Sequence, residues 1–364
     1  MVSCDLCGSS EFAVLFTWQD PCVPDRERTS RVVECHGCGL IYLYPRPGGS
    51  EIAAYYQQDC IDDLGRAGGP TRRRSSSLRK LRKSIRRALL EEFYRYPTSA
   101  CGPRAWANGH GRLGLLKTAC LRVEQWRLRL IGREAAIIPF TGEGRLLDVG
   151  CGTGKALEAF RKIGWDITGV EINPQAASIA RRRLGCQILL GGFEEVPLDN
   201  ERFDVVRFCH SLEHLPSPRG ALEKAHRILR PTGLVWIEVP NAASLERHLF
   251  GEHWFGWGLP GHLYHFTQET LAHLLARTGF RPLKLKHDGR ALVFAESVSN
   301  VLECWLGNRP RRTKWIKAMA RPLTCALGAM NRGSILFVHA EKNGAGRAAS
   351  SCEGDDRRSW GSGG

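Results

Sequence analysis

The stretch LLDVGCGTGKAL, residues 146–157, joins a short apolar segment to the start of a helical segment through a turn with three glycines. Gly150, Gly152 and Gly154 alternate with other residues, and Asp148 precedes them at the end of the apolar segment. Glycine lets the backbone adopt turns and approach a bound molecule closely. The stretch therefore predicts a buried strand, a ligand-binding turn and a helix.

Two common glycine-rich motifs do not fit this turn. A phosphate-binding loop requires glycine where Val149 stands and a hydroxyl residue where Ala156 stands. The dinucleotide fingerprint requires glycine at its sixth position, which is Lys155 here. The acidic Asp148 suits an ammonium or sulfonium ligand better than a pyrophosphate.

Strand-like and helix-like segments alternate around this turn. Expected strands are 145–150, 165–173, 186–192, 202–210, 234–241 and 334–342, and expected helices are 155–164, 174–185, 218–233 and 267–280. Such alternation is typical of an α/β protein with a doubly wound parallel sheet covered on both faces. Ligands of these sheets bind at the carboxyl ends of the strands.

The second expected strand ends at Glu171 in GVEIN, and a carboxylate there can accept hydrogen bonds from both hydroxyls of a ribose. Together with LLDVGCGTG and the later FDVVRFCHSLEHL, this pattern resembles the class I S-adenosylmethionine-dependent methyltransferases over residues 144–288. The resemblance implies a Rossmann-like fold and S-adenosylmethionine as cofactor. It also implies that Asp148, Gly150, Gly152 and Gly154 line the methionine part and that Glu171, followed by Ile172, holds the ribose.

Three further residues are expected at the cofactor. The resembled superfamily often has an acidic residue after the third strand, but this chain has Gly192 there. We therefore expect the backbone, Phe193 and the neighbouring Glu194 to hold the adenine. His210 directly follows the fourth strand and is expected to touch the cofactor.

Two CxxC pairs near the N-terminus predict a metal site. Cys4 and Cys7 form one pair, Cys35 and Cys38 form the other, and a glycine follows each pair. Four thiolates in two such turns favour structural Zn(II), whereas free thiols or a redox pair are the alternative. The pattern resembles the zinc-binding, zinc-ribbon-like module of a bacterial methyltransferase group whose members act on nucleotide sugars and on cell-surface or natural-product intermediates.

Methyl transfer from a sulfonium is an in-line displacement, so the protein must position the acceptor and remove its proton. The expected catalytic residues are Glu213, His214, Tyr264 and His265, with His253 and His262 as further candidate bases. The Glu213–His214 pair resembles one that helps to bind a divalent metal in ubiquinone-pathway and RNA 3′-end methyltransferases, although those families have glutamate in place of His210. A metal site, packing and a general base stay open. The expected aromatic wall of the acceptor pocket comprises Trp254, Phe255, Trp257 and Phe266.

The expected organisation is a zinc module at 1–48, a basic helical linker or lid at 49–143, and the methyltransferase domain at 144–342. We expect a helical insertion at about 297–330 and a disordered, polar tail at 343–364. The absence of an apolar run of about 20 residues and of a signal-like N-terminus predicts a cytoplasmic location.

The formal net charge is +15, and basic residues gather at 72–87 and again at 309–330, each with apolar residues at helical spacing. A solvated helix, an anionic membrane surface and a diphosphate-bearing substrate all fit these segments. The favoured partner is a small-molecule acceptor, such as a sugar, a lipid-linked intermediate or a natural product. The alternative is a nucleic-acid-binding protein or RNA methyltransferase that uses the zinc module and the basic helix. The sequence leaves the oligomeric state open.

Overall fold

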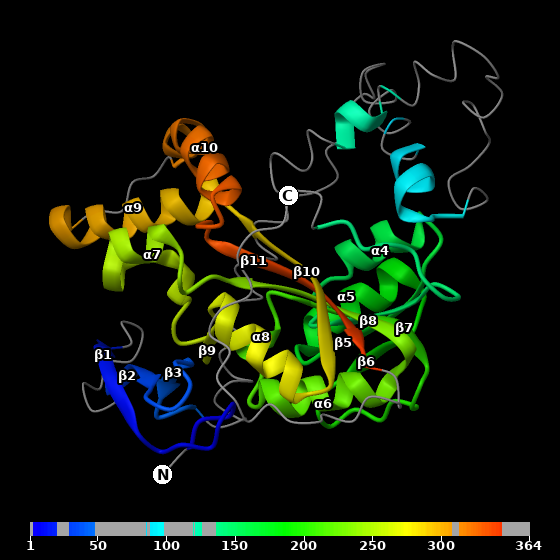
Figure 1. Cartoon of the computed structure of the whole chain (residues 1–364), viewed down its shortest axis with the longest axis horizontal. Coiled ribbons are helices and arrows are strands. Elements are labelled where there is room, and N and C mark those ends of the chain that lie inside the picture. The colour runs from blue at the N-terminus through cyan, green and yellow to red at the C-terminus, as the bar shows by residue number, and fades with distance from the viewer. Residues whose placement is uncertain are drawn as a thin grey trace.

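The computed structural model describes residues 3–19, 29–47, 85, 88–97, 119, 121–125, 136–307 and 313–343. The basic segment at 72–87, apart from Ile85, and the tail after residue 343 lie outside the described residues. The described part contains one large and one small sheet (Figure 1).

The large sheet has seven strands in the order β10-β11-β8-β7-β4-β5-β6. Their bounds are β4 (Arg145–Val149), β5 (Asp166–Glu171), β6 (Ile188–Leu190), β7 (Phe203–Cys209), β8 (Leu229–Pro240), β10 (Phe280–Asp288) and β11 (Ile335–Lys342). Strands β8, β7, β4, β5 and β6 are parallel to one another, which confirms the Rossmann-like α/β fold. The sheet is mixed rather than wholly parallel, because β11 is antiparallel to both of its neighbours.

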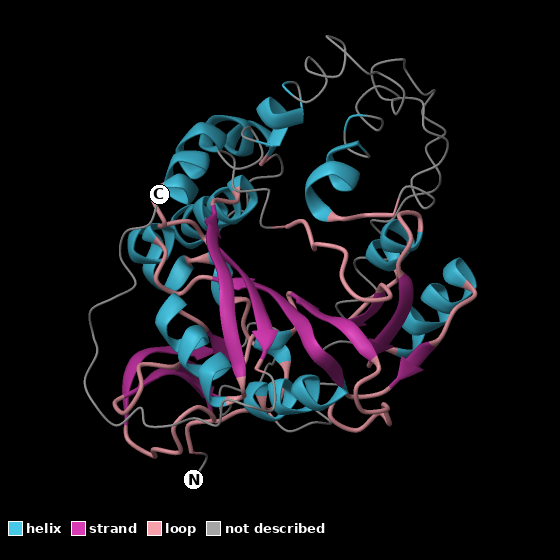
Figure 2. Ribbon diagram, turned by 45° about the vertical axis from the view of Figure 1, so that its right-hand side comes forward, coloured by secondary structure: helices cyan, strands magenta, loops and turns pink. Residues whose placement is uncertain are grey.

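Helices lie on both faces of this sheet (Figure 2). They include α4 (Lys155–Arg161), α5 (Pro174–Leu184), α6 (Pro218–Ile228) and α8 (Gln268–Arg277). Their starts follow from local capping: the side chain of Asn173 caps α5, that of Ser217 caps α6, and Thr267 forms a capping box for α8. Each cap accepts a backbone N–H that the first helical turn leaves without a partner.

Two expected boundaries were wrong. Helix α6 ends at Ile228, not at residue 233, and β8 begins at Leu229. The residue before a proline is disfavoured in the helical conformation, so Arg230, followed by Pro231, is extended. Strand β10 was not expected, because its burial pattern is irregular and polar residues occupy much of it.

The small sheet joins the N-terminal segment to the α/β domain. Its order is β1 (Phe12–Gln19), β2 (Thr29–Cys35), β3 (Ile41–Tyr44) and β9 (Tyr264–His265). The fourth strand therefore comes from a part of the chain about 220 residues after the third. The carboxylate of Asp5 also accepts hydrogen bonds from the Ser217 hydroxyl and the Arg219 backbone N–H, at 2.8 and 2.9 Å. The N-terminal module is therefore docked by a strand pair and by a polar contact.

The remaining elements lie near the carboxyl ends of the parallel strands. They are η2 (Leu212–His214), α7 (Leu245–Phe250), η3 (Gly251–His253), η4 (Phe255–Trp257), α9 (Ala291–Leu306) and α10 (Lys314–Ala329). Helices α9 and α10 correspond to the insertion expected at about 297–330, but α9 begins at Ala291. Among the described residues, no helix is long and apolar enough to cross a membrane.

Helix α10 packs directly against the backbone that follows β10. A Cβ atom added at Gly289 would lie only 1.7 Å from the Thr324 carbonyl oxygen, and one at Gly333 would lie 2.5 Å from the Asp288 carbonyl oxygen. A side chain at Gly289 would therefore push the helix away from the sheet, and one at Gly333 would collide with the end of β10.

We predict that Gly289→Ala lowers the free energy of unfolding by about 3 kcal/mol, because a rigid backbone atom occupies the position of the new methyl group. Denaturant unfolding would measure the change. Gly307→Ala is the control: Gly307 has a φ of 67° and open space around it, so strain of about 1 kcal/mol is its only expected cost. Equal losses in the two variants would contradict the packing argument.

Candidate functional site

The candidate site lies at the carboxyl edge of the parallel strands. Asp148 and Glu171 lie near the ends of β4 and β5, His210 directly follows β7, and Glu238 lies near the end of β8. Because these strands are parallel neighbours, the four side chains meet at one edge of the sheet.

The three glycines of the turn have different roles. All have left-handed backbones, with φ of 73° at Gly150, 55° at Gly152 and 74° at Gly154. A Cβ atom at Gly150 would lie 3.0 Å from the Ser211 side chain, and one at Gly154 would lie 2.8 Å from Leu184. A Cβ atom at Gly152 would meet no described residue within 4 Å. Gly150 and Gly154 therefore permit close packing, whereas Gly152 faces open space.

Glu171 lies beside this open position. Its carboxylate accepts hydrogen bonds from the backbone N–H groups of Gly152 and Asn173, at 2.7 and 2.8 Å. Burial raises the pKa of Glu171, and these backbone hydrogen bonds partly offset the effect. The neighbouring Ile172 is 38% exposed, and Leu190 at the end of β6 is 45% exposed. The edge thus combines a carboxylate with apolar surface.

Asp148 forms a buried ion pair that the sequence did not reveal. Its Oδ1 atom lies 2.6 Å from an Arg207 guanidinium nitrogen, and Asp148 and Arg207 are direct neighbours across β4 and β7. The guanidinium stacks over Trp236, 4.9 Å from the ring centroid. Burial raises the pKa of Asp148, and the charge of Arg207 opposes that shift. Among the described residues, the Oδ2 atom of Asp148 has no hydrogen-bond partner.

Phe193 is buried, whereas the neighbouring Glu194 is exposed. The Phe193 ring is buried and packs edge to face against Phe208, with 5.6 Å between centroids. Lys224 donates a hydrogen bond to the Phe193 carbonyl oxygen at 2.7 Å, which fixes this segment. Glu194 is exposed. Of the two, only Glu194 has a side chain that solvent can reach.

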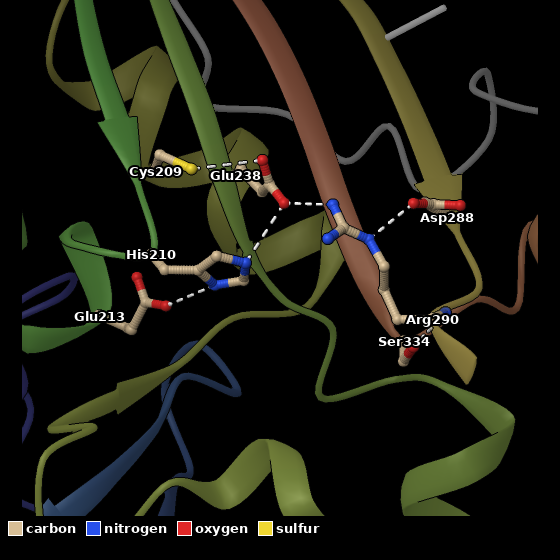
Figure 3. Close-up of polar contacts among 7 residues, drawn as sticks. All are labelled: Cys209, His210, Glu213, Glu238, Asp288, Arg290 and Ser334. Carbon is tan, nitrogen blue, oxygen red and sulfur yellow. Dashed lines mark hydrogen bonds and ion pairs between the residues drawn. The ribbon is translucent and has the colours of Figure 1, made fainter. Parts of the chain in front are cut away.

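His210 lies between two carboxylates (Figure 3). Its Nδ1 atom is 3.4 Å from Glu213, and its Nε2 atom is 3.2 Å from Glu238. Arg290 pairs with Glu238 and with Asp288, which extends the row of alternating charges. Burial alone would lower the pKa of His210, but the two carboxylates outweigh it and raise the pKa to about 9. His210 is therefore a cation at neutral pH and cannot accept a proton there.

Glu213, His214 and His262 offer ligand atoms that lie within 4.8 Å of one another. His214 and His262 each place Nδ1 next to a backbone carbonyl oxygen, of Gly261 at 2.9 Å and of Gly256 at 3.0 Å. An Nδ1–H that donates to a carbonyl leaves the lone pair on Nε2. Glu213 is fully buried, and its Oε2 atom has no partner among the described residues. Two imidazoles and a carboxylate suit a transition metal better than Mg(II).

The other candidate bases are enclosed. The Tyr264 hydroxyl donates a hydrogen bond to the Pro216 carbonyl oxygen at 2.9 Å. His265 is buried with its ring 4.8 Å from that of Trp257, and neither ring nitrogen has a partner among the described residues. Burial lowers the pKa of His265 well below its usual value, so the ring is neutral. His253 is more exposed than these residues, and its Nε2 atom lies 4.0 Å from the Oε1 atom of Glu252.

Most of the expected aromatic wall is core. Trp254, Trp257 and Phe266 are buried, and Phe255 alone among the four is exposed, at 40%. These three side chains therefore stabilise the loop after α7 rather than form an open surface.

The four cysteines come together as two matching turns. The sulfur atoms of Cys4 and Cys38 lie 3.5 Å apart, those of Cys7 and Cys35 lie 3.4 Å apart, and all four lie within 4.8 Å. Gly8 and Gly39, which follow the pairs, have left-handed backbones. Zinc–sulfur bonds of about 2.3 Å give a tetrahedron with edges of about 3.8 Å. The cluster is thus the right size for a tetrathiolate metal site.

Comparison with known proteins agrees with the fold and the edge geometry. Residues 118–285 match the family model described as a methyltransferase domain. The chain carries an S-adenosylmethionine-dependent methyltransferase domain. The expectation of a methyltransferase enzyme is thereby confirmed.

Two curated relatives illustrate the range of similarity. The ubiquinone biosynthesis O-methyltransferase of Cereibacter sphaeroides is 27% identical over 238 residues, which cover 60% of this chain and 91% of the relative. The malonyl-acyl-carrier-protein O-methyltransferase of Serratia marcescens is 32% identical over 117 residues, which cover 30% of this chain and 43% of the relative. For the Serratia enzyme and some others, the match spans less than half of the relative's length.

A solved structure of an S-adenosylmethionine-dependent methyltransferase from Mesorhizobium loti is also similar. It is 18% identical with a TM-score of 0.42, and the alignment covers 60% of this chain and 97% of that one.

Glu246 in the first turn of α7 yields a prediction on pH. Burial raises its pKa from 4.5 to about 7, and the nearby Asp288 adds to the shift. A carboxyl group whose pKa rises on folding costs stability above its unfolded pKa, and the cost is complete above its folded pKa.

We therefore predict that Glu246→Gln raises the free energy of unfolding at pH 8 by about 3 kcal/mol and changes it little at pH 5. Denaturant titrations at both pH values would measure this difference. Glu195→Gln, on the surface, is the matched control and should change neither value. Destabilisation by Glu246→Gln at pH 8 would show that the ionised carboxylate has a favourable partner.

Proposed function

We propose that the protein transfers a methyl group from S-adenosylmethionine to a hydroxyl group of a small-molecule acceptor, such as a sugar, a lipid-linked intermediate or a natural product. One observation carries the proposal: Glu213 and His214 lie in η2, shortly after β7, at the same edge as the glycine turn and Glu171. The names of the two curated relatives, both O-methyltransferases, support an oxygen acceptor.

The edge of β4, β5 and β6 fits the cofactor. Gly152 faces open space, and the buried Oδ2 atom of Asp148 has no partner among the described residues, so a cationic group of the ligand would satisfy it. In this proposal Glu171 accepts hydrogen bonds from the ribose hydroxyls. The exposed Ile172 and the backbone near Glu194 would contact the adenine. The bound cofactor supplies a methyl group already activated by its positive sulfur.

His214 is the proposed general base, with Glu213 beside it. With the cofactor bound, the acceptor oxygen would bond to the methyl carbon as the bond from that carbon to the positive sulfur breaks, the bonding pair staying on sulfur. The hydroxyl proton passes to Nε2 of His214, which holds the lone pair because Nδ1–H donates to Gly261. The negative charge of Glu213 favours the resulting imidazolium. His210 keeps Glu213 in place through its own charge. The burial of Tyr264 and His265 favours positioning roles for them.

The four cysteines would hold Zn(II) as a structural ion. Four thiolates fill a tetrahedral site and leave no position for a substrate. The rival assignment for Glu213, His214 and His262 is a second metal site, in which His214 would be a ligand rather than the base.

Calorimetric titration with S-adenosylmethionine tests the cofactor site. We predict that Glu171→Gln weakens binding about tenfold or more, because hydrogen bonds to a charged carboxylate are worth about 1.5 to 3 kcal/mol. Glu201→Ala is the control, since Glu201 precedes β7 at the opposite edge of the sheet. Equal affinity of wild type and Glu171→Gln for S-adenosylmethionine would show that Glu171 does not contribute to cofactor binding.

Metal analysis of the purified protein tests the zinc site and the rival metal site together. We predict one zinc per chain, lost in Cys35→Ser/Cys38→Ser and retained in His262→Ala. A second bound metal that disappears in His262→Ala would assign Glu213, His214 and His262 to a metal and exclude His214 as the base. Protein without zinc that keeps its full stability would contradict the structural role.

The alternative of RNA binding makes a different prediction. Contacts with phosphates make affinity fall steeply with salt, so tight RNA binding that weakens in this way would favour it.

A further inference from the structure

Helix α10 has an apolar surface that no described residue covers. Its exposed residues include Trp315, Met319 and Leu323, with exposures of 76, 81 and 49%. They are four residues apart, so they form one stripe along the helix. Met330, just past the end of the helix, is 66% exposed. A soluble surface helix normally shows polar residues on its outer face.

This stripe is separate from the face that anchors α10. The buried residues of the helix are Ala320, Thr324, Leu327 and Gly328, and they lie against β10 and the backbone at Gly289. At 100° per residue, the anchoring face and the stripe lie on different sides of the helix. The exposed apolar residues are therefore not needed to fix α10 to the domain.

The neighbouring elements also carry exposed apolar side chains. Trp305 and Leu306, in the last turn of α9, are 80 and 67% exposed. Helix α7 packs against α9 and has the exposed residue Leu249, at 66%. Figure 1 shows α7, α9 and α10 gathered at one end of the molecule.

The exposed charges of α10 itself are basic. Lys314 and Arg321 are exposed and lie on the same flank of α10, about 100 to 120° from Trp315. Arg332 is exposed shortly after the helix, and α10 itself contains no acidic residue. Lys317 is paired with Glu296 of α9 at 3.0 Å. One flank of α10, on the Trp315 side of the stripe, thus carries exposed basic groups.

We propose that α10, with the end of α9, docks in the plane of an anionic lipid surface. Tryptophan and methionine would enter the boundary between headgroups and acyl chains, while Lys314, Arg321 and Arg332 would contact the phosphates. Tryptophan is favoured there because its ring is apolar and its N–H is polar. A second copy of the chain fits less well, because a symmetric contact through the stripe would bring these basic groups together.

The proposed surface adjoins the loop beside the active site. The backbone N–H of Phe255 donates to the Ser297 hydroxyl of α9 at 2.9 Å, and Asn300 of α9 donates to the His253 carbonyl oxygen at 3.1 Å. Docking would therefore hold the loop that follows α7 near the bilayer, where a lipid-linked acceptor would be found. The proposed docking to a lipid surface does not depend on which acceptor the protein methylates.

Vesicle flotation of the full-length, zinc-containing protein tests this proposal. Vesicles of phosphatidylcholine alone would be compared with vesicles that also contain phosphatidylglycerol. We expect binding to the anionic vesicles that Trp315→Ser/Met319→Ser weakens about tenfold or more. Lys314→Glu/Arg321→Glu should weaken binding to anionic vesicles and reduce its dependence on lipid charge.

Matched variants keep the test decisive. Val14→Ser/Leu283→Ser removes two other exposed apolar side chains, of 47 and 49% exposure, and should bind like wild type. Thermal unfolding would verify that all variants fold, and cofactor titration would report separately on the methyltransferase site. Absence of wild-type flotation, or equal loss in both serine pairs, would overturn the proposal. A wild-type dimer that Trp315→Ser/Met319→Ser dissociates, without flotation, would assign the stripe to self-association instead.

Discussion

The site depends on the parallel arrangement of β4, β5, β7 and β8. In parallel neighbours the carboxyl ends share one edge, so residues separated by about 20 to 90 positions in the chain become neighbours there. The ion pair between Asp148 and Arg207 joins two of these strands inside the sheet. Removing either partner would leave a buried charge without compensation, which is among the most costly single changes in a protein.

The N-terminal module is connected to the same edge through backbone. The Leu263 carbonyl oxygen accepts a hydrogen bond from Leu43 of β3, and the Leu263 N–H donates to the Glu213 carbonyl oxygen, at 2.9 and 2.8 Å. One residue thus links the small sheet to the Glu213–His214 pair. Metal in the cysteine cluster would stabilise β2 and β3, and through this link it would also support the position of the proposed base.

Features that depend only on nearby residues, such as turns and helix starts, were predicted from the sequence. The glycine turn, the starts of α5, α6 and α8, and the two CxxC turns each depend on residues a few positions apart. The stretch LLDVGCGTG and Glu171 also located the edge of the sheet where the glycine turn and the acid lie together.

Residues whose roles depend on distant strands were not found. Arg207, Glu238 and Arg290 act through neighbours in the sheet. His262 was named as a candidate base, but its position beside Glu213 and His214, from a loop about 50 residues away, was not predicted. The one available signal was the arginine inside the apolar run FDVVRFC, because a buried charge requires a partner. Strand β9 has two residues and no recognisable pattern, so its pairing with β3 could not be expected.

Hydrogen–deuterium exchange with S-adenosylhomocysteine is the most direct test of the central claim, that the cofactor binds at the carboxyl edge of β4, β5 and β7. Binding should slow exchange in peptides that cover 148–154, 171–173, 192–194 and 210–214, since these backbone segments meet at that edge. Peptides from 12–19 and 314–329 should be unchanged. Protection restricted to those two regions, or saturating ligand without protection at 148–154, would contradict the account.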